Sequence, residues 1–230
     1  FPAVLAAQVP GARIVCIDLP GNGARCEEPS PWRIRGMVDG LRADLAARGE
    51  QGPFSVVALS LGGMTALEWM SLYPQEVRRA ALINTSLSAL SPFWHRLRPA
   101  NYVRMLAGVA AGGIARERMI LDITTNQVDD IEPIVQRWAG YAREYPVSPR
   151  SMLAQLFAAG TYRRPAQGPS CPALVLNGGG DRLVDPRCSE RVAAVFGLPL
   201  ERHLQAGHDL ALDAPQWLAA RLAAFAARTA

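Results

Sequence analysis

The sequence contains no lysine, since all 24 of its basic side chains are arginine. This absence excludes Schiff-base catalysis, a Ser-Lys dyad and the phosphate-binding lysine of a P-loop, because each of them requires a lysine amine. Histidine is also scarce: there are 3 residues and no H-x-x-x-H pair, so a histidine-rich metal site is not expected. The sequence implies no metal, nucleotide or flavin cofactor.

The four cysteines show neither metal-ligand spacing nor a disulfide framework, so we expect reduced thiols and a cytoplasmic protein. The longest uncharged run of small residues, 105–115, is too short to span a membrane. The formal net charge of +4 is mild and the arginines are scattered, which argues against nucleic acid as a partner. With 230 residues, 50% of them hydrophobic, the chain can bury one sizeable core.

Apolar runs of strand length alternate with helix-period segments along much of the chain. The pattern predicts strands at residues 12–19, 54–59, 79–85, 173–177 and 200–204, and helices at residues 1–9, 32–48, 61–73, 187–196 and 214–227. This alternation predicts an α/β fold with a mostly parallel, doubly wound sheet that carries helices on both faces. In such sheets, ligands bind beyond the carboxyl ends of the strands.

Residues 87–170 interrupt the alternation with helix-period stretches and no strong strand. An insertion that leaves the carboxyl end of one strand and returns to the same sheet would lie over the binding site. We therefore predict a core made of residues 1–86 and 171–230, with a helical cap at residues 87–170. An independent helical domain is the less favoured alternative. The aromatic residues of this segment could line a substrate pocket or form the cap's own core.

One serine stands where a predicted strand runs directly into a predicted helix. Ser60 follows the apolar segment 54–59 and is flanked by the small residues Ala58, Gly62 and Gly63. A turn this tight strains its central residue and needs small neighbours. It also pushes the Ser60 hydroxyl out beyond the sheet, beside the free N–H groups of the helix. Ser60 is therefore a candidate nucleophile; the alternative is a serine that only caps the helix.

A carboxylate follows a second strand in the same way. Asp181 comes after the predicted strand 173–177 and three glycines, whose conformational freedom would let its carboxylate swing toward the neighbouring strand. Asp185 competes for this role, but the Pro186 that follows it favours a helix start. Asp181 is therefore the preferred acid, and the alternative for either residue is a capping carboxylate.

The candidate base lies after the last predicted strand. His208 falls on the loop between this strand and the final helix. His95 falls in the predicted cap and His203 within the last strand, so neither follows a strand end. A lone histidine is usually a packed or solvated side chain. His208 is the exception because it stands where a partner for Ser60 and Asp181 is required.

The chain order Ser60, Asp181, His208, together with the strand–turn–helix serine, resembles the α/β-hydrolases. Asp-Leu-Pro-Gly-Asn-Gly at residues 18–23 is similar to the family's loop after the strand that precedes the nucleophile strand, and Gly-x-x-Asp at 178–181 and Gly-His at 207–208 match its remaining motifs. Ala58 replaces the first glycine of G-x-S-x-G and is still small. The resemblance implies a serine hydrolase that forms an acyl-enzyme from a small or medium carboxylic ester, thioester or lactone.

The oxyanion hole is where the chain departs from this family. The resemblance implies two backbone donors, and the N–H of Leu61 is the only one that can be assigned. The family's other donor belongs to a His-Gly-type loop before the helix that residues 1–9 continue, and no such segment is present. Phe1 is also not a natural start. We therefore interpret the chain as lacking its beginning, including N-terminal strands; one lost donor costs on the order of 3 kcal/mol of transition-state stabilisation.

Two other functions remain open. Residues 60–69 and the Gly-His-Asp at 207–209 resemble homoserine acetyltransferases, but the likeness is confined to these patches. An acyltransferase of the same fold is therefore the alternative. A non-catalytic binding protein on this scaffold is disfavoured because Ser60, Asp181 and His208 are all present. If the protein is a hydrolase or an acyltransferase, the expected partner is a small-molecule acyl substrate.

Overall fold

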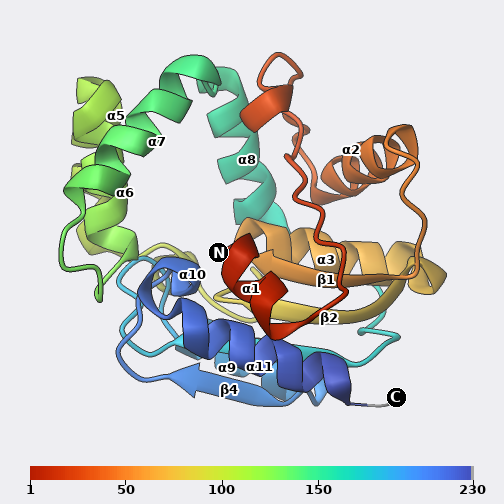
Figure 1. Cartoon of the computed structure of the whole chain (residues 1–230). Helices are drawn as coiled ribbons and strands as arrows, with labels where there is room; N and C mark the ends of the chain where they lie inside the picture. The colour runs from red at the N-terminus through yellow and green to blue at the C-terminus, as the bar shows by residue number, and fades with distance from the viewer. Residues whose placement is uncertain (229–230) are drawn as a thin grey trace.

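The computed structural model describes residues 1–228 of the chain. Within them, four parallel strands form one sheet, whose spatial order β1-β2-β3-β4 follows the order in sequence. These strands are β1 (Phe54–Leu59), β2 (Val77–Ile83), β3 (Ala173–Gly178) and β4 (Leu200–His203). Because the strands are parallel, their carboxyl ends meet at one edge of the sheet (Figure 1). The prediction of a parallel α/β fold is confirmed.

Helices cover both faces of this sheet (Figure 1). They are α1 (Pro2–Gln8), α2 (Ile34–Ala47), α3 (Leu61–Leu72), α9 (Arg187–Phe196), α10 (Leu210–Asp213) and α11 (Pro215–Ala227). The first face carries α2, α3 and α9, and the opposite face carries α1, α10 and α11. None of the helices in residues 1–228 combines the length and apolar character that a bilayer crossing requires.

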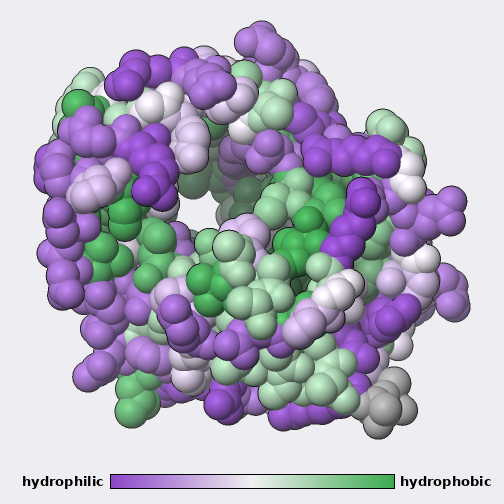
Figure 2. Space-filling model, in the orientation of Figure 1, coloured by the Kyte–Doolittle hydropathy of each residue, from purple (hydrophilic) through white to green (hydrophobic). Residues whose placement is uncertain are grey.

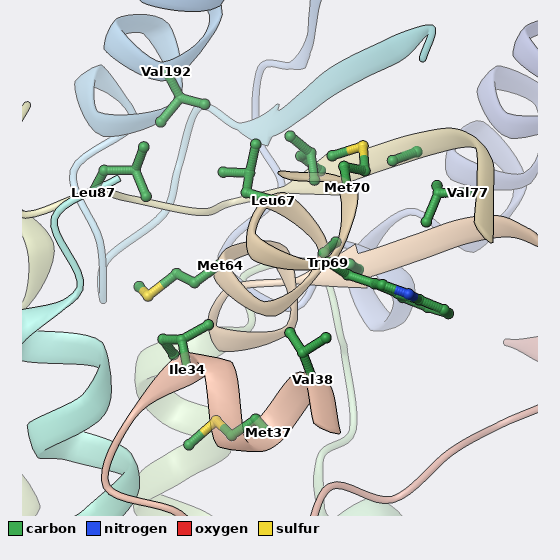
Figure 3. Packing of buried hydrophobic residues seen from close by; sticks show 14 of the residues in the cluster. Ile34, Met37, Val38, Met64, Leu67, Trp69, Met70, Val77, Leu87 and Val192 are labelled. Carbon is green, nitrogen blue, oxygen red and sulfur yellow. The ribbon is translucent and has the colours of Figure 1, made fainter. Parts of the chain in front are cut away.

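The strand residues divide between two hydrophobic cores. Leu82 of β2 belongs to the core under α2 and α3, whereas its neighbour Ile83 belongs to the core under α11. Successive strand residues point to opposite faces, so a central strand covered on both sides is apolar at nearly every position. Figure 3 shows the first core, where Met37 of α2 lies below Met64 and Leu67 of α3.

The strand predicted at residues 12–19 is wrong, because these residues have no regular secondary structure. A strand requires backbone pairing with a neighbour, and no strand pair within residues 1–228 includes this segment. Its apolar side chains are used for packing instead: Ile17 and Leu19 are partly buried against the core of α2 and α3. Residues 12–19 therefore have the side-chain composition of a strand without forming one.

Residues 87–170 contain helices and, within the described structure, no strand. We call these helices the helical insertion: α4 (Phe93–Arg96), α5 (Tyr102–Ala111), α6 (Gly113–Thr124), α7 (Glu132–Glu144) and α8 (Pro149–Thr161). Helices α5 to α7 stand apart from the sheet on the side of the strand carboxyl ends (Figure 1). The molecule is hollowed between them and the core (Figure 2). This placement is what a cap requires, and the division into core and cap stays a prediction.

Candidate active site

Ser60 lies between β1 and α3 in a backbone conformation that few non-glycine residues adopt. Its φ is 53° and its ψ is −113°, and such a conformation costs on the order of 1–3 kcal/mol. Hydrogen bonds hold it there. The Ser60 N–H donates to the Ile83 carbonyl (2.8 Å), and the Ser60 carbonyl accepts from the Thr85 hydroxyl (2.8 Å). The strained turn expected at this serine is present.

Gly63 allows this turn to approach the end of β2. A Cβ on Gly63 would lie 2.7 Å from the Cβ of Thr85, which is closer than side chains tolerate. A Cβ on Gly62 would meet only the Cβ of Ala58, at an ordinary 3.8 Å. Close packing therefore requires glycine at residue 63 rather than at residue 62. Ala58 itself is buried, and its Cβ lies at that ordinary distance from the Gly62 position, so alanine can stand there in place of glycine.

Asp181 and His208 are joined by a buried hydrogen bond. Nδ1 of His208 lies 2.7 Å from Oδ2 of Asp181, and the two residues are 5% and 2% exposed. The other carboxylate oxygen, Oδ1, accepts from the backbone N–H groups of Leu183 (2.8 Å) and Val184 (2.9 Å). These bonds fix the carboxylate. The bond to Oδ2 also occupies Nδ1 of His208, so the other ring nitrogen, Nε2, is left for another partner.

Asp185, the competing carboxylate, is engaged elsewhere. Its Oδ2 lies 2.7 Å from the Arg187 guanidinium, and Arg98 is near the same oxygen at 4.0 Å. The hydrogen bonds from Arg187 lower the pKa of the Asp185 carboxyl to about 2. Asp185 therefore holds an ion-pair cluster at the start of α9 and does not contact His208.

The other two histidines also have different surroundings. Nδ1 of His203 accepts the N–H of Ala206 (3.0 Å) in the turn after β4. His95 lies in α4, with its Nε2 3.3 Å from the Arg187 guanidinium. Of the three histidines, all within the described residues, His208 is the one hydrogen-bonded to a carboxylate.

The glycine run 178–180 before Asp181 serves close packing. None of these glycines has a positive φ. A Cβ on Gly179 would lie 2.6 Å from the Leu204 carbonyl oxygen, and the two other glycines would clash similarly with the backbone that precedes His208. The predicted reason for the run, conformational freedom, is therefore wrong. The loops of Asp181 and His208 lie backbone to backbone, and only glycine leaves the space for this.

The turn after α6 contacts both of these loops. The Asp213 carboxylate accepts the N–H groups of Asn126 (2.9 Å) and Gly207 (2.5 Å). The Asn126 side chain donates to the carbonyls of Gly180 (2.8 Å) and Gln205 (3.1 Å). The helical insertion is thus attached directly to the segments that carry Asp181 and His208. Sequence reasoning missed both polar residues, since their partners are distant along the chain.

Asn84 and Thr85 were missed as well, although they carried a signal. They follow the carboxyl end of β2 directly, which is the edge where parallel sheets bind ligands. Thr85 contacts Ser60, and the Asn84 side chain contacts the His208 loop. Polar residues directly after a predicted strand were the signal that identified Asp181, and Asn84 and Thr85 carry the same signal.

The structure brings Ser60 and the Asp181–His208 pair to one edge of the sheet, but it does not join them. Within residues 1–228, no hydrogen bond links the Ser60 hydroxyl to the His208 ring. Catalytic hydrogen bonds often become short only when substrate binds. Leu61 begins α3, so its N–H is among the first-turn amides without an intrahelical acceptor. The roles of these four residues stay predictions.

Candidate metal ligands are dispersed. Within the described part of the chain, no three side chains of the His, Cys, Asp or Glu type lie together as a metal ion would require. The four cysteines are unpaired: Cys188 is buried, Cys16 is exposed, and Cys26 and Cys171 are intermediate.

A parallel sheet covered on both faces, with a strained serine turn and an Asp–His pair at its carboxyl edge, defines the α/β-hydrolase architecture. The sequence profile of the alpha/beta hydrolase family matches residues 1–221. The chain belongs to this family. The resemblance found in its motifs is confirmed.

Individual relatives include esterases. A stretch of 70 residues is 41% identical to the pimeloyl-[acyl-carrier protein] methyl ester esterase of Chromobacterium violaceum. This match covers 30% of this chain and 25% of the length of that relative.

The fold is also similar to those of solved enzymes. The esterase EaEST from Exiguobacterium antarcticum superposes with a TM-score of 0.74 at 15% identity, covering 97% of this chain and 85% of that chain. The enol-lactonase from Burkholderia xenovorans gives a TM-score of 0.68 at 19% identity, covering 92% of this chain and 79% of that chain. At such low identities the likeness shows the fold alone.

Proposed function

We propose that this protein is a serine hydrolase that cleaves a small or medium carboxylic ester, thioester or lactone with Ser60, His208 and Asp181. The observation that carries the proposal is the buried 2.7 Å hydrogen bond between Asp181 and His208, at the same sheet edge as the strained Ser60. Membership of the α/β-hydrolase family supports a hydrolytic reaction. The partial match to a methyl ester esterase supports an ester as the substrate.

In the first step, the Ser60 oxygen attacks the carbonyl carbon of the substrate while Nε2 of His208 takes the hydroxyl proton. The hydrogen bond from Nδ1 to Asp181 holds the ring with Nε2 directed away from the carboxylate. The Asp181 carboxylate stabilises the imidazolium that forms. The Leu61 N–H donates to the oxyanion of the tetrahedral intermediate.

In the second step, the intermediate collapses as His208 returns its proton to the leaving oxygen or sulfur. An alcohol or thiol departs, or the ring of a lactone opens, and the acyl group remains on Ser60. Water then attacks this acyl-enzyme with His208 as the base, which releases the acid and restores the serine. The helical insertion acts as a cap that shapes the acyl pocket, because it stands over the strand carboxyl ends.

Covalent labelling and ester hydrolysis test the proposal. A fluorophosphonate probe should modify Ser60, and the protein should hydrolyse p-nitrophenyl acetate and butyrate. His208→Ala should lower turnover by at least about 10³-fold. Asp185→Asn is the matched control and should stay within about threefold of the wild type, since Asp185 does not contact His208. Absence of labelling at Ser60, or near-normal turnover in His208→Ala, would overturn the proposal.

The acyltransferase alternative rests on the likeness of residues 60–69 to homoserine acetyltransferases. The two reactions share the acyl-enzyme and differ only in the nucleophile that removes the acyl group from Ser60: water in a hydrolase, an acceptor molecule in a transferase. The same p-nitrophenyl esters should therefore be assayed with and without an added alcohol or amine acceptor. Product that depends on the acceptor, with negligible hydrolysis, would favour the transferase.

A further inference from the structure

The turn at residues 83–85, where β2 ends, contacts both halves of the candidate site. On one side it holds the nucleophile: the Ile83 carbonyl accepts the Ser60 N–H at 2.8 Å, and the Thr85 hydroxyl donates to the Ser60 carbonyl at 2.8 Å. On the other side, the Asn84 side chain reaches the loop of His208. One short turn thus lies between the two residues that must exchange a proton.

The carboxamide of Asn84 makes three hydrogen bonds to this second half. Its Nδ2 donates to the carbonyls of His208 (2.7 Å) and Gly207 (3.3 Å). Its Oδ1 accepts the N–H of Gly178 (3.0 Å), at the start of the loop that leads to Asp181. Only this orientation of the amide satisfies all of them, because two partners are acceptors and the third is a donor.

The backbone of Asn84 is unusual for a buried residue. It has a φ of 46° and is 2% exposed, and its own N–H donates to the Leu176 carbonyl of β3 at 3.0 Å. Asparagine adopts the left-handed region more readily than other side chains, but at some cost in energy. Burying an amide is unfavourable unless all its groups are paired. The left-handed backbone of Asn84 therefore has an energetic cost, and the burial of its amide is compensated by bonds to the residues around the site.

We propose that Asn84 is a positioning residue that sets the place of His208 relative to Ser60. This inference rests on the proposed function. Asp181 fixes one nitrogen of the imidazole, and that bond alone still lets the ring shift with its main chain. Asn84 fixes the His208 main chain through its carbonyl, from the same turn that holds Ser60. Together the two contacts define where Nε2 lies with respect to the serine hydroxyl.

Three substitutions separate the side chain of Asn84 from its backbone. Asn84→Ala removes the amide, and Asn84→Gly also removes it but accepts the positive φ. Both should lower kcat for p-nitrophenyl butyrate by about 100-fold, the effect of a misplacement of about 1 Å, with KM within about threefold of the wild type. Asn84→Asp keeps the acceptor for Gly178 and places a carboxylate beside the His208 carbonyl. The carboxylate cannot donate to that carbonyl, so kcat should fall in this variant too although the side chain keeps nearly the same volume.

A second readout does not depend on turnover. The chain has only 3 histidines, so the Nδ1 proton of His208 can be assigned by NMR from its loss in His208→Gln. In Asn84→Ala and Asn84→Gly this resonance should shift or broaden, since the histidine main chain is released. A purely structural role would not change it.

The matched control is Asn177. It is also a buried asparagine near the carboxyl end of a strand, and its side chain binds the Pro186 carbonyl and Arg202. Asn177→Ala should lower the melting temperature about as much as Asn84→Ala does, while kcat and the His208 resonance stay near those of the wild type.

The outcomes distinguish the two proposals. If Ser60→Ala is inactive while Asn84→Ala and Asn84→Gly keep kcat and the His208 resonance, the positioning role is wrong and the proposed function stands. Equal losses of kcat in Asn84→Ala and Asn177→Ala would also overturn the positioning role. If Ser60→Ala retains turnover, the proposed function fails, and the resonance still tests Asn84. If the alanine and glycine variants do not fold, the nearly isosteric Asn84→Asp decides through kcat and the His208 resonance.

Discussion

The nucleophile half and the base half of the candidate site are held in place by different means. Ser60 is fixed by main-chain geometry: its φ is positive, its N–H donates to Ile83, its carbonyl accepts from Thr85, and Gly63 approaches Thr85 closely. In the base half, the Asp181 side chain accepts three hydrogen bonds, one of them from His208. Among the described residues, 1–228, the Ser60 hydroxyl has no hydrogen-bond partner. Changing it should affect chemistry alone, whereas changing Asp181 should affect chemistry and stability together.

The largest expected effect comes from Asp181→Asn. The amide cannot hold His208 in the tautomer that leaves Nε2 free as a base, so kcat should fall by about 10⁴-fold. The amide oxygen can still accept the Leu183 and Val184 N–H groups, but the amide nitrogen would face the His208 Nδ1–H, which loses its buried acceptor. This unpaired donor should lower the free energy of unfolding by about 1–3 kcal/mol. Ester hydrolysis and urea denaturation measure the two effects. If Asp181→Asn is as stable as the wild type, the Asp181 side chain does not stabilise the fold and the two halves do not differ in this respect.

The next effect tests the backbone packing of the base half. Gly179→Ala would push a methyl group against the Leu204 carbonyl and should destabilise the protein by about 1–3 kcal/mol. It should also lower kcat, because the Asp181 and His208 loops must separate. Gly140→Ala in α7 is the control: its Cβ would meet nothing within 4 Å, so the better helix former should add about 1 kcal/mol. Thermal unfolding of both variants would show whether the glycine run is there for space.

Much of the site could be predicted from the sequence because its signals are local. A strand that runs into a helix through Ser60, with small residues on each side, specifies the turn without knowledge of any distant contact. Asp181 and His208 were found in the same way, since each follows a predicted strand. The preference for Asp181 over Asp185 rested on Pro186, which does precede a helix that begins at Arg187.

The remainder depended on contacts that no local pattern specifies. Residues 12–19 have the composition of a strand, but pairing with a neighbour decides whether a strand forms. The glycines before Asp181 were understood as flexible, because the loop that lies against them is about 25 residues further along the chain. The role of Asn84 depends on its meeting Gly178 and His208, which only the folded sheet brings together.

A smaller effect concerns Asp185, the carboxylate outside the candidate site that pairs with Arg187 at the start of α9. The pKa of Asp185 is about 2 in the folded protein because of Arg187, against about 3.9 in an unfolded chain. A lowered folded-state pKa stabilises the protein above the unfolded value, and this contribution disappears as the pH falls through the folded value. Asp185→Asn should therefore cost about 1–2 kcal/mol at pH 7, allowing for solvent screening, and almost nothing near pH 2. Denaturation between these pH values would measure it. A constant gap would mean that Asp185 acts through its shape rather than its charge.

The smallest effect tests the strain at the nucleophile directly. Glycine adopts a positive φ freely, so Ser60→Gly should relieve the strain of the turn and raise the free energy of unfolding by about 1 kcal/mol. Ser60→Ala keeps a Cβ at a φ of 53° and should gain nothing, although both variants lose the attacking hydroxyl. The difference between the two, measured by urea denaturation, isolates the backbone from the chemistry. If the glycine variant is no more stable than the alanine variant, the serine is not held under strain, and the nucleophile half would be no different in kind from the hydrogen-bonded half beside it.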